Sequence, residues 1–215
     1  YQANILFRTN LSHQRKGYAL DEAIQQILHK KYDAYFIFDA DNVLDNNYFK
    51  EMTKTYLEGY DIGLGYRNCK NGNANVIASC SALTFSMINT LSNQRRQKQN
   101  NALTLSGTGF YVTGELIAKW QGYPFHTLTE DYELTLYASL HHLSMHYNDK
   151  AILFDEQPTT YKVTKTQRIR WIKGYFEARK KYLPLLTQKL KDNPKNKTSI
   201  LLEIVGIYPI ISLLI

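Results

Sequence analysis

Cysteine is scarce in this chain of 215 residues, which contains Cys69 and Cys80 and no other cysteine. Two cysteines are too few for a disulfide framework, and these two lack the spacing of metal ligands. This scarcity favours a reducing, cytosolic environment. The sequence also shows no internal repeat and no recognised nucleic-acid-binding motif. Repeat architectures are therefore excluded, and a nucleic-acid partner is not expected.

Positive charge is concentrated in one late segment. Residues 162–197 contain 12 Lys or Arg and two acidic residues, a net charge of +10 in a chain whose total is +7. The rest of the chain is therefore slightly acidic. A basic segment followed by an apolar one is typical of the cytoplasmic side of a membrane. Nucleic-acid binding by this segment is the competing interpretation.

The apolar segment is residues 199–215, in which Glu203 is the one charged residue. Its 17 residues fall just short of the roughly 20 that span a bilayer. The pattern favours the start of a transmembrane helix over a core helix. Because the chain begins without Met and stops within this pattern, we expect a fragment of a longer protein. We expect one domain over residues 1–185, a basic juxtamembrane segment over 186–198 and a transmembrane start over 199–215.

Strands that alternate with helices predict an α/β layered fold. We expect strands at residues 4–8, 35–38, 62–66, 110–112 and 151–154. We expect helices at residues 20–31, 47–58, 76–97, 127–140 and 166–182. The apolar run Tyr35-Phe36-Ile37-Phe38 predicts a strand buried on both faces, as in a parallel sheet flanked by helices.

Two carboxylates follow that strand directly, in Asp39-Ala40-Asp41. Open α/β folds bind ligands at the carboxyl edge of the sheet, where these side chains would lie. Two residues apart in an extended chain, both point to the same side. Paired hard oxygen atoms suit Mg²⁺ or Mn²⁺, with a diphosphate in the remaining positions. A turn-forming role is the alternative interpretation.

A second acidic pair, Glu130 and Asp131, stands at an expected helix start. Thr127 and Glu130 have capping-box spacing, and acids in a first turn complement the helix dipole, so a structural role is one interpretation. In the other, Asp131 is a general base that takes a proton from a hydroxyl nucleophile. Glu130 would then have two roles: it would cap the helix and hold the geometry of Asp131.

The third pattern is Gln167-Arg168-Ile169-Arg170-Trp171. It places an amide, a guanidinium and an indole within one helical turn, where they can bind a diphosphate and stack on a ring. A basic amphipathic helix lying on lipid, with Trp171 as its interface anchor, is the alternative. Both can hold, because different faces of one helix can serve both.

In this order the three patterns resemble those of the membrane-embedded family 2 glycosyltransferases, which include cellulose, hyaluronan and poly-N-acetylglucosamine synthases. The matching motifs are D-x-D at Asp39 and Asp41, T-E-D at residues 129–131 and Q-x-x-R-W at residues 167–171. Residues 16–20 resemble the family's K-G-x-A-L segment, residues 156–160 its E-x-P-T stretch and residues 106–109 its small-residue loop. The resemblance covers about residues 5–182.

The resemblance implies a Rossmann-like glycosyltransferase A-type (GT-A) fold that is incomplete at its N-terminus. The family's first nucleotide-binding strand and its D-G-S-like turn have no counterpart here, so we expect the isolated 215 residues to be inactive or nearly so. The implied enzyme is a metal-dependent, inverting hexosyl- or N-acetylhexosaminyltransferase at the cell membrane, with its catalytic domain on the cytoplasmic side. It would move a sugar from a nucleotide sugar, usually a UDP-sugar, to a saccharide or lipid acceptor, in polysaccharide synthesis.

The resemblance also implies a role for each matched residue. Asp131 would be the base, with Glu130 beside it, and Asp41 and Asp39 would hold Mg²⁺ or Mn²⁺. The donor diphosphate and nucleotide would contact Asp39, Lys16, Gln167, Arg170 and Trp171. The acceptor would contact Gly107, Thr108 and Trp171.

Three other functions stay open at this point. A non-processive enzyme of the same family would add one sugar to a lipid acceptor. A metal-dependent phosphohydrolase could use Asp39 and Asp41, although it would leave Gln167, Arg170 and Trp171 unexplained. A catalytically inactive membrane scaffold or nucleic-acid binder could rely on the basic segment alone.

Overall fold

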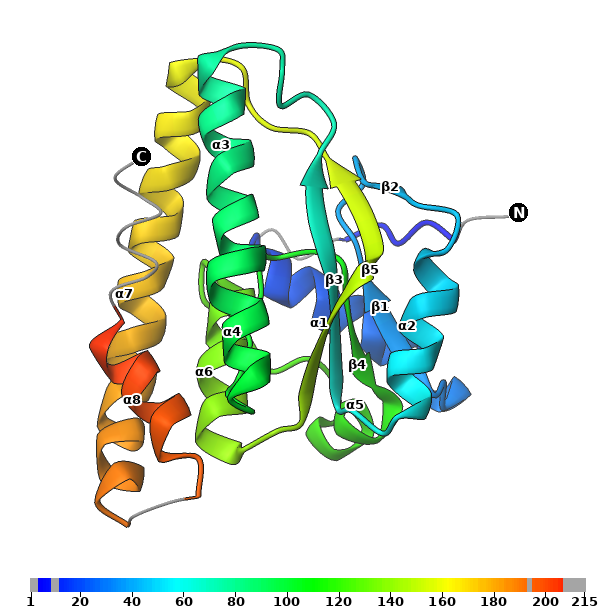
Figure 1. Cartoon of the computed structure of the whole chain (residues 1–215). Helices are drawn as coiled ribbons and strands as arrows, with labels where there is room; N and C mark the ends of the chain where they lie inside the picture. Colours follow the sequence, from blue (N-terminus) through cyan, green and yellow to red (C-terminus); the bar gives the residue numbers. More distant parts are fainter. Residues whose placement is uncertain (1–3, 9–11, 193–194, 207–215) are drawn as a thin grey trace.

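The computed structural model describes residues 4–8, 12–192 and 195–206. In these residues a five-stranded mixed sheet has the order β1-β4-β3-β5-β2. Its strands are β1 (Ala34–Ile37), β2 (Val43–Leu44), β3 (Ile62–Cys69), β4 (Phe110–Thr113) and β5 (Met145–Asp155). The helices around it (Figure 1) are α1 (Lys16–Ile27), η1 (Leu28–Lys30), α2 (Tyr48–Leu57), α3 (Val76–Met87), η2 (Ile88–Asn93), α4 (Gln94–Lys98), α5 (Gly114–Trp120), α6 (Glu130–His141), α7 (Tyr161–Lys191) and α8 (Lys197–Val205).

Helices cover both faces of the sheet because side chains along each strand alternate between the faces. On β4, Phe110 and Val112 belong to the larger apolar core, which also contains residues of α1, α5 and α6. Tyr111 lies between them and belongs to a second cluster with Tyr48 and Met52 of α2. The predicted α/β class, with helices on both faces, is confirmed.

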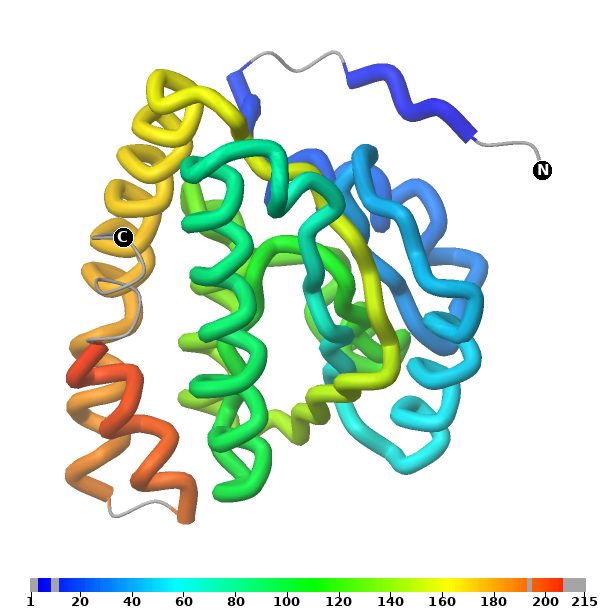
Figure 2. The backbone as a smooth tube through the Cα atoms, turned by 45° about the horizontal axis from the view of Figure 1, so that its top comes forward, coloured from blue at the N-terminus to red at the C-terminus, as the bar shows by residue number. Residues whose placement is uncertain are grey.

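A third apolar cluster joins α6, α7 and α8. Tyr132 of α6 stacks on Tyr175 of α7 with ring centroids 5.1 Å apart, and Ile200 of α8 is buried in the same cluster. Figure 2 shows α3 and α7 side by side, with α8 against the C-terminal half of α7. The end of the chain that the structure describes is therefore packed onto the domain.

The sheet differs from the parallel arrangement that we expected. β1 lies at one edge of the described sheet and pairs antiparallel with β4; β3 and β5 are the parallel pair among the described strands. Tyr35 and Ile37 are buried, but Ala34 and Phe36 are half-buried. The prediction of burial on both faces is therefore wrong. The run is apolar because its second face carries a small aromatic layer, in which Phe36 meets Phe49 edge-on.

The strand expected at residues 4–8 does not form either. The side chains of Ile5 and Phe7 are exposed, and Arg8 is instead held by Glu22 of α1 at 2.7 Å. An apolar sequence becomes a strand when a neighbouring strand offers a partner, and residues 4–8 pair with none of the described strands.

In the ranges that the structure describes, no helix is long and apolar enough to cross a membrane. α8 ends at Val205 and is followed by its C-cap Gly206, whose φ is +56°; residues 207–215 of the predicted transmembrane segment lie outside the described residues. Glu203 is buried and pairs with Arg96 of α4 at 2.5 Å. Residues 199–205 thus belong to a helix packed on the domain, and a transmembrane helix is not supported among the described residues. The boundary expected at residue 185 falls inside α7.

Candidate active site

Several segment ends meet at one edge of the sheet. Because β4 runs antiparallel to β1, the loop that precedes β4 lies beside the loop that follows β1. The amide of Asp39 accordingly donates a hydrogen bond to Oγ1 of Thr108 at 3.0 Å. β3 and β5 run parallel and end at paired residues, Cys69 and Asp155. The ends of β1, β3 and β5 and the loop before β4 therefore lie together at this edge of the sheet.

A cavity of about 400 Å³ lies at this edge of the sheet. It is lined by residues from seven separate parts of the chain. The predicted residues among them are Lys16, Asp39, Gly107, Glu130, Asp131, Gln167, Arg170 and Trp171. Residues that were singled out from unrelated stretches of sequence thus line one space.

Lys16 connects several of these groups. Its ammonium forms an ion pair with the carboxylate of Asp39 and donates to the carbonyl of Gly107 at 2.7 Å. It also lies 3.9 Å from Oε1 of Glu130. A cation in this position can attract a phosphate group while it balances the two carboxylates.

Two glycines allow the helices to approach the cavity. A Cβ atom on Gly17 of α1 would lie 1.9 Å from the carbonyl oxygen of Phe125. A Cβ atom on Gly174 of α7 would lie 2.6 Å from side-chain atoms of Thr129. Both positions exclude any larger residue, because real Cβ atoms do not come this close to other atoms. Lys16 and Trp171 reach the cavity as a result.

The acidic pair lies at the first turn of α6. Burial raises the pKa of Glu130 to about 7, and the neighbouring charge of Asp131 adds to this effect. Burial also raises the pKa of Asp131. Two adjacent carboxylates in a low-dielectric site cannot easily both ionise, so they titrate as a unit. Such a pair can accept a proton near neutral pH.

The capping-box interpretation of this pair is wrong. The N-cap of α6 is Thr129, and its side chain makes no capping hydrogen bond. The hydroxyl of Thr127 donates to the carbonyl of Thr129 at 3.1 Å, and the amide of Thr127 donates to Glu133 at 2.9 Å. The hydroxyl and the amide of Thr127 therefore bond groups other than those of a capping box, and Glu130 lines the cavity.

The α7 residues form the opposite wall with α3. The indole of Trp171 meets Phe85 of α3 edge-on, with ring centroids 6.3 Å apart. Tyr175 follows one turn later on α7 and also lines the cavity. Its hydroxyl donates to the carbonyl of Gly206 at 2.8 Å. This aromatic wall offers flat surfaces of the kind on which sugar rings stack.

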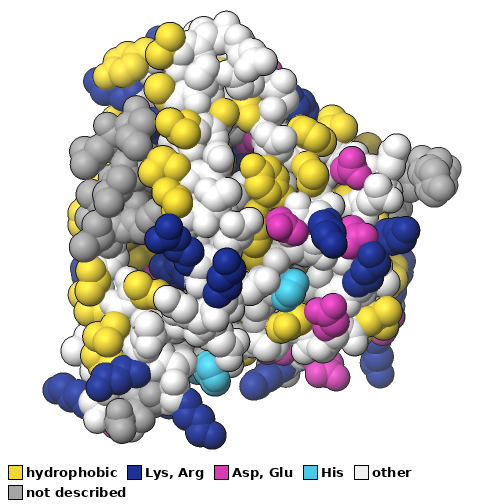
Figure 3. Space-filling model, in the orientation of Figure 1, with side chains coloured by type: hydrophobic (Ala, Val, Ile, Leu, Met, Phe, Trp, Pro, Cys, Tyr) yellow, Lys and Arg dark blue, Asp and Glu magenta, His cyan; other side chains and the backbone are white. Residues whose placement is uncertain are grey.

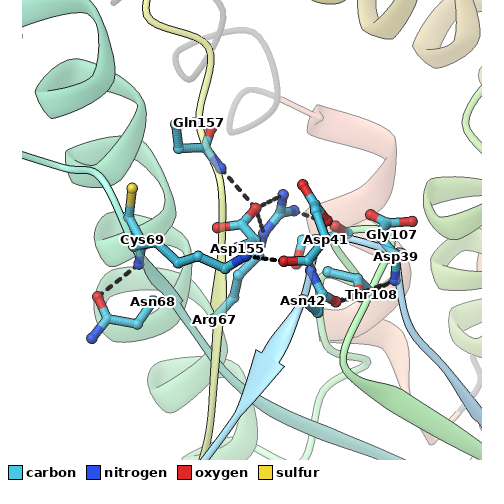
Figure 4. A network of polar contacts seen from close by, with 12 residues as sticks. Asp39, Asp41, Asn42, Arg67, Asn68, Cys69, Gly107, Thr108, Asp155 and Gln157 are labelled. Carbon is cyan, nitrogen blue, oxygen red and sulfur yellow. Dashed lines mark hydrogen bonds and ion pairs between the residues drawn. The ribbon is translucent and has the colours of Figure 1, made fainter. Parts of the chain in front are cut away.

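Two predicted site residues do not line the cavity. Thr108 is fully buried beneath it. Asp41 is exposed, and its carboxylate accepts a hydrogen bond from Nδ2 of Asn42 at 3.2 Å. Figure 4 shows Asp39, Asp41, Asn42 and Thr108 in one polar cluster. The roles predicted for these residues stay predictions.

A divalent metal ion fits the chemistry of this cluster. Within the described ranges, no three His, Cys, Asp or Glu side chains gather as a metal site. Mg²⁺, however, is commonly held by one or two carboxylates together with substrate phosphates and water. Asp39 and Asp41 supply hard oxygen donors of this kind, two residues apart.

Arg67 also lines the cavity, and it was not predicted. It lies near the end of β3 and pairs with Asp155 at the end of β5. A charged residue directly after the apolar stretch of residues 62–66 was the available signal. The signal is weak, because its meaning depends on a partner that is distant in the sequence.

Comparison with known proteins shows the family to which this chain belongs. A family model described as "Glycosyltransferase like family 2" matches residues 2–174. The chain belongs to glycosyltransferase family 2. It is 28% identical over 156 residues to "Probable glycosyltransferase YdaM" of Bacillus subtilis (strain 168), an alignment that covers 66% of this chain and 34% of that relative. The chain thus spans about a third of the length of the curated relative. The mixed α/β fold described above is consistent with a GT-A fold.

Proposed function

We propose that this protein is an inverting glycosyltransferase of the GT-A type, which moves a sugar from a UDP-sugar to an acceptor hydroxyl in polysaccharide synthesis. The observation that carries the proposal is the shared cavity. It is lined by Lys16 of α1 and by Asp39 after β1, by Glu130 and Asp131 at the start of α6, and by the Q-x-x-R-W side chains on α7. Membership of family 2 supports a nucleotide-sugar donor and an acceptor.

In the proposed reaction the acceptor oxygen attacks the anomeric carbon of the donor sugar. A new carbon–oxygen bond forms as the bond from that carbon to the diphosphate oxygen breaks, and the nucleoside diphosphate leaves with the bonding electrons. Asp131 takes the proton of the hydroxyl, which is a poor nucleophile at neutral pH. The raised pKa of Asp131 suits this role, because a base whose pKa lies closer to neutrality accepts a proton more readily.

Negative charge grows on the leaving diphosphate, and cationic groups fixed in advance stabilise it. Lys16 and Arg170 line the cavity and supply such charge. Bound Mg²⁺ or Mn²⁺, held by Asp39 and Asp41, would supply further charge stabilisation. Trp171 would stack on the acceptor sugar beside the Gly107–Thr108 loop.

We further propose that the protein works at the cytoplasmic face of the cell membrane. Ile169 and Phe176 on the outer side of α7 are 42% and 62% exposed, and they alternate with basic residues of the same helix. Figure 3 shows apolar and basic side chains on the side of the molecule where α7 and α8 lie. Such a surface favours contact with anionic lipid.

Transfer of a single sugar to a lipid acceptor is the second candidate. It is favoured by the apolar part of the cavity wall, to which Phe85, Ile88 and Leu105 contribute. The two candidates differ in product length, since a polysaccharide synthase makes chains and the alternative adds one residue.

The test is an assay of full-length protein in membranes with a panel of UDP-sugars and Mg²⁺ or Mn²⁺, followed by mass spectrometry of the product. We expect transfer from at least one donor and a loss of about 10³-fold or more in Asp131→Asn, because the base is removed. Asp149→Asn is the control, since Asp149 is exposed on β5 and outside the cavity lining. Free phosphate without any transferred sugar, or full activity in Asp131→Asn, would contradict the proposal.

A further inference from the structure

Arg67 is fixed by contacts with three different residues at the edge of the cavity. Nε donates to Oδ2 of Asp155 at 2.7 Å, and Nη2 contacts the same oxygen. Nη1 donates to the carbonyl of Ser106. The guanidinium carbon lies 3.7 Å from the centroid of the Phe85 ring. A planar fork held in this way has one orientation.

The anchor of this fork is itself rigid. Asp155 is buried, and its Oδ2 also accepts a hydrogen bond from Nε2 of Gln157 at 2.7 Å. Gln157 is held in turn by Asn71, which bonds both its backbone NH and its carbonyl at 2.8 Å. Figure 4 shows Gln157, Asp155 and Arg67 in one connected row. A buried carboxylate of this kind requires its cation.

The other end of the fork holds a loop that carries donor-site contacts. Ser106 precedes Gly107, whose φ is +87° and whose carbonyl accepts the hydrogen bond from Lys16. Thr108 follows, and its hydroxyl accepts the hydrogen bond from the amide of Asp39. Loss of the contact at Ser106 would therefore release the two residues that hold Lys16 and Asp39.

We propose that Arg67 is a positioning residue: through the carbonyl of Ser106 it fixes the 106–108 loop, and the loop fixes Lys16 and Asp39 for the donor diphosphate. This inference rests on the proposed function. It assigns Arg67 no contact with the reacting atoms. Arg67 acts on the donor site through the backbone of the 106–108 loop. A displacement of this loop by about 1 Å would misplace Lys16 and Asp39, and displacements of that size can cost about 10²-fold in rate.

The chain contains a matched control in the pair Arg96–Glu203. Its two side chains are 11% and 3% exposed, the same values as for Arg67 and Asp155. Arg96 also donates to a backbone carbonyl, that of Ala102, at 2.9 Å. Neither Arg96 nor Glu203 lines the cavity. Removal of either arginine leaves a buried carboxylate unpaired, so both variants should lose similar stability.

The experiment compares Arg67→Gln, Arg67→Lys and Arg96→Gln in the full-length protein. We expect both Gln variants to melt at a lower temperature. We expect Arg67→Gln to raise KM for the donor and to lower kcat/KM by about 10²-fold, while Arg96→Gln stays within about threefold of wild type. Arg67→Lys should recover part of this loss, because it keeps the charge but not the fork. Equal kinetic losses in the two Gln variants would overturn the inference.

A second readout does not depend on activity. Hydrogen–deuterium exchange of the amides of residues 105–109 should rise in Arg67→Gln and stay unchanged in Arg96→Gln. If the wild type transferred no sugar, the proposed function would fail, and the exchange data would still decide whether Arg67 holds the loop. Unchanged exchange in Arg67→Gln would overturn the inference.

If Arg67→Gln does not fold, the double variant Arg67→Met/Asp155→Leu removes both charges, an exchange that proteins often tolerate. This variant still lacks the contact to Ser106. We therefore expect it to fold and to keep the kinetic loss and the raised exchange at residues 105–109. A folded double variant with wild-type kinetics would count against the proposal.

Discussion

Replacement of Glu130 with Gln should stabilise the protein at pH 8, and it should do so less at pH 5. Burial raises the pKa of Glu130 from 4.5 to about 7, with a contribution from Asp131. The folded state therefore binds a proton more tightly than the unfolded state does. Stability falls as the pH rises from about 4.5 to about 7 and stays low above that window. Gln keeps the shape of the side chain and carries no charge.

The magnitude follows from the two pKa values. The difference between 4.5 and about 7 corresponds to about 3 kcal/mol, at 1.36 kcal/mol per pKa unit. The attraction of Lys16, which lies 3.9 Å from Glu130, lowers this pKa and is already contained in the value of about 7. The gain is reduced because an acid in the first turn of a helix contributes about 0.3–1 kcal/mol. We expect a net gain of about 2–3 kcal/mol at pH 8 and below about 0.5 kcal/mol at pH 5.

Urea unfolding of both proteins at pH 8 and pH 5 measures this difference. Glu58→Gln is the control, because Glu58 is exposed at the end of α2 and should change the free energy of unfolding by less than about 0.5 kcal/mol. A Glu130→Gln variant that is less stable than wild type at pH 8 would refute the reasoning. So would a gain that is just as large at pH 5.

Two further predictions follow from buried charges. Glu203→Ala should lower the free energy of unfolding by about 3–5 kcal/mol, because the charge of Arg96 is left buried and unpaired; an unchanged urea midpoint would show that α8 does not pack as described. The rate of sugar transfer should fall as the pH drops from 8 to 5, because the pKa of Asp131 is raised and a protonated base cannot accept the hydroxyl proton. A pH–rate profile that is flat over this range would show that the acidic pair is not the base.

Most residues that the sequence singled out line the cavity, and each of them belongs to a local pattern. Asp39 follows an apolar run, the acidic pair opens a helix, and the α7 residues share one turn. The pairing of the strands could not be predicted. The apolar run of β1 is compatible both with an interior strand of a parallel sheet and with an edge strand covered by aromatic rings. Arg67 was missed because its role depends on Asp155, 88 residues later in the chain.

The transmembrane helix expected over residues 199–215 is not supported in the part of the segment that the structure describes, for a related reason. Ile200 of this segment packs against α6 and α7, whereas Leu201, Leu202 and Val205 are exposed. The one charge of this stretch, on Glu203, is satisfied by Arg96, 107 residues earlier. Hydropathy records that a segment avoids water, and it does not distinguish lipid from a protein surface as the alternative environment.

The central claim is that α1 and α7 face one donor site, and tryptophan fluorescence tests it most directly. The chain has two tryptophans; Trp171 lines the cavity, and Trp120 packs against the core away from it. Titration of full-length protein with UDP and Mg²⁺ should quench emission, Trp171→Phe should remove the quenching, and Lys16→Met should weaken binding by about tenfold or more. Quenching that survives Trp171→Phe, with an affinity that is indifferent to Lys16→Met, would contradict the account.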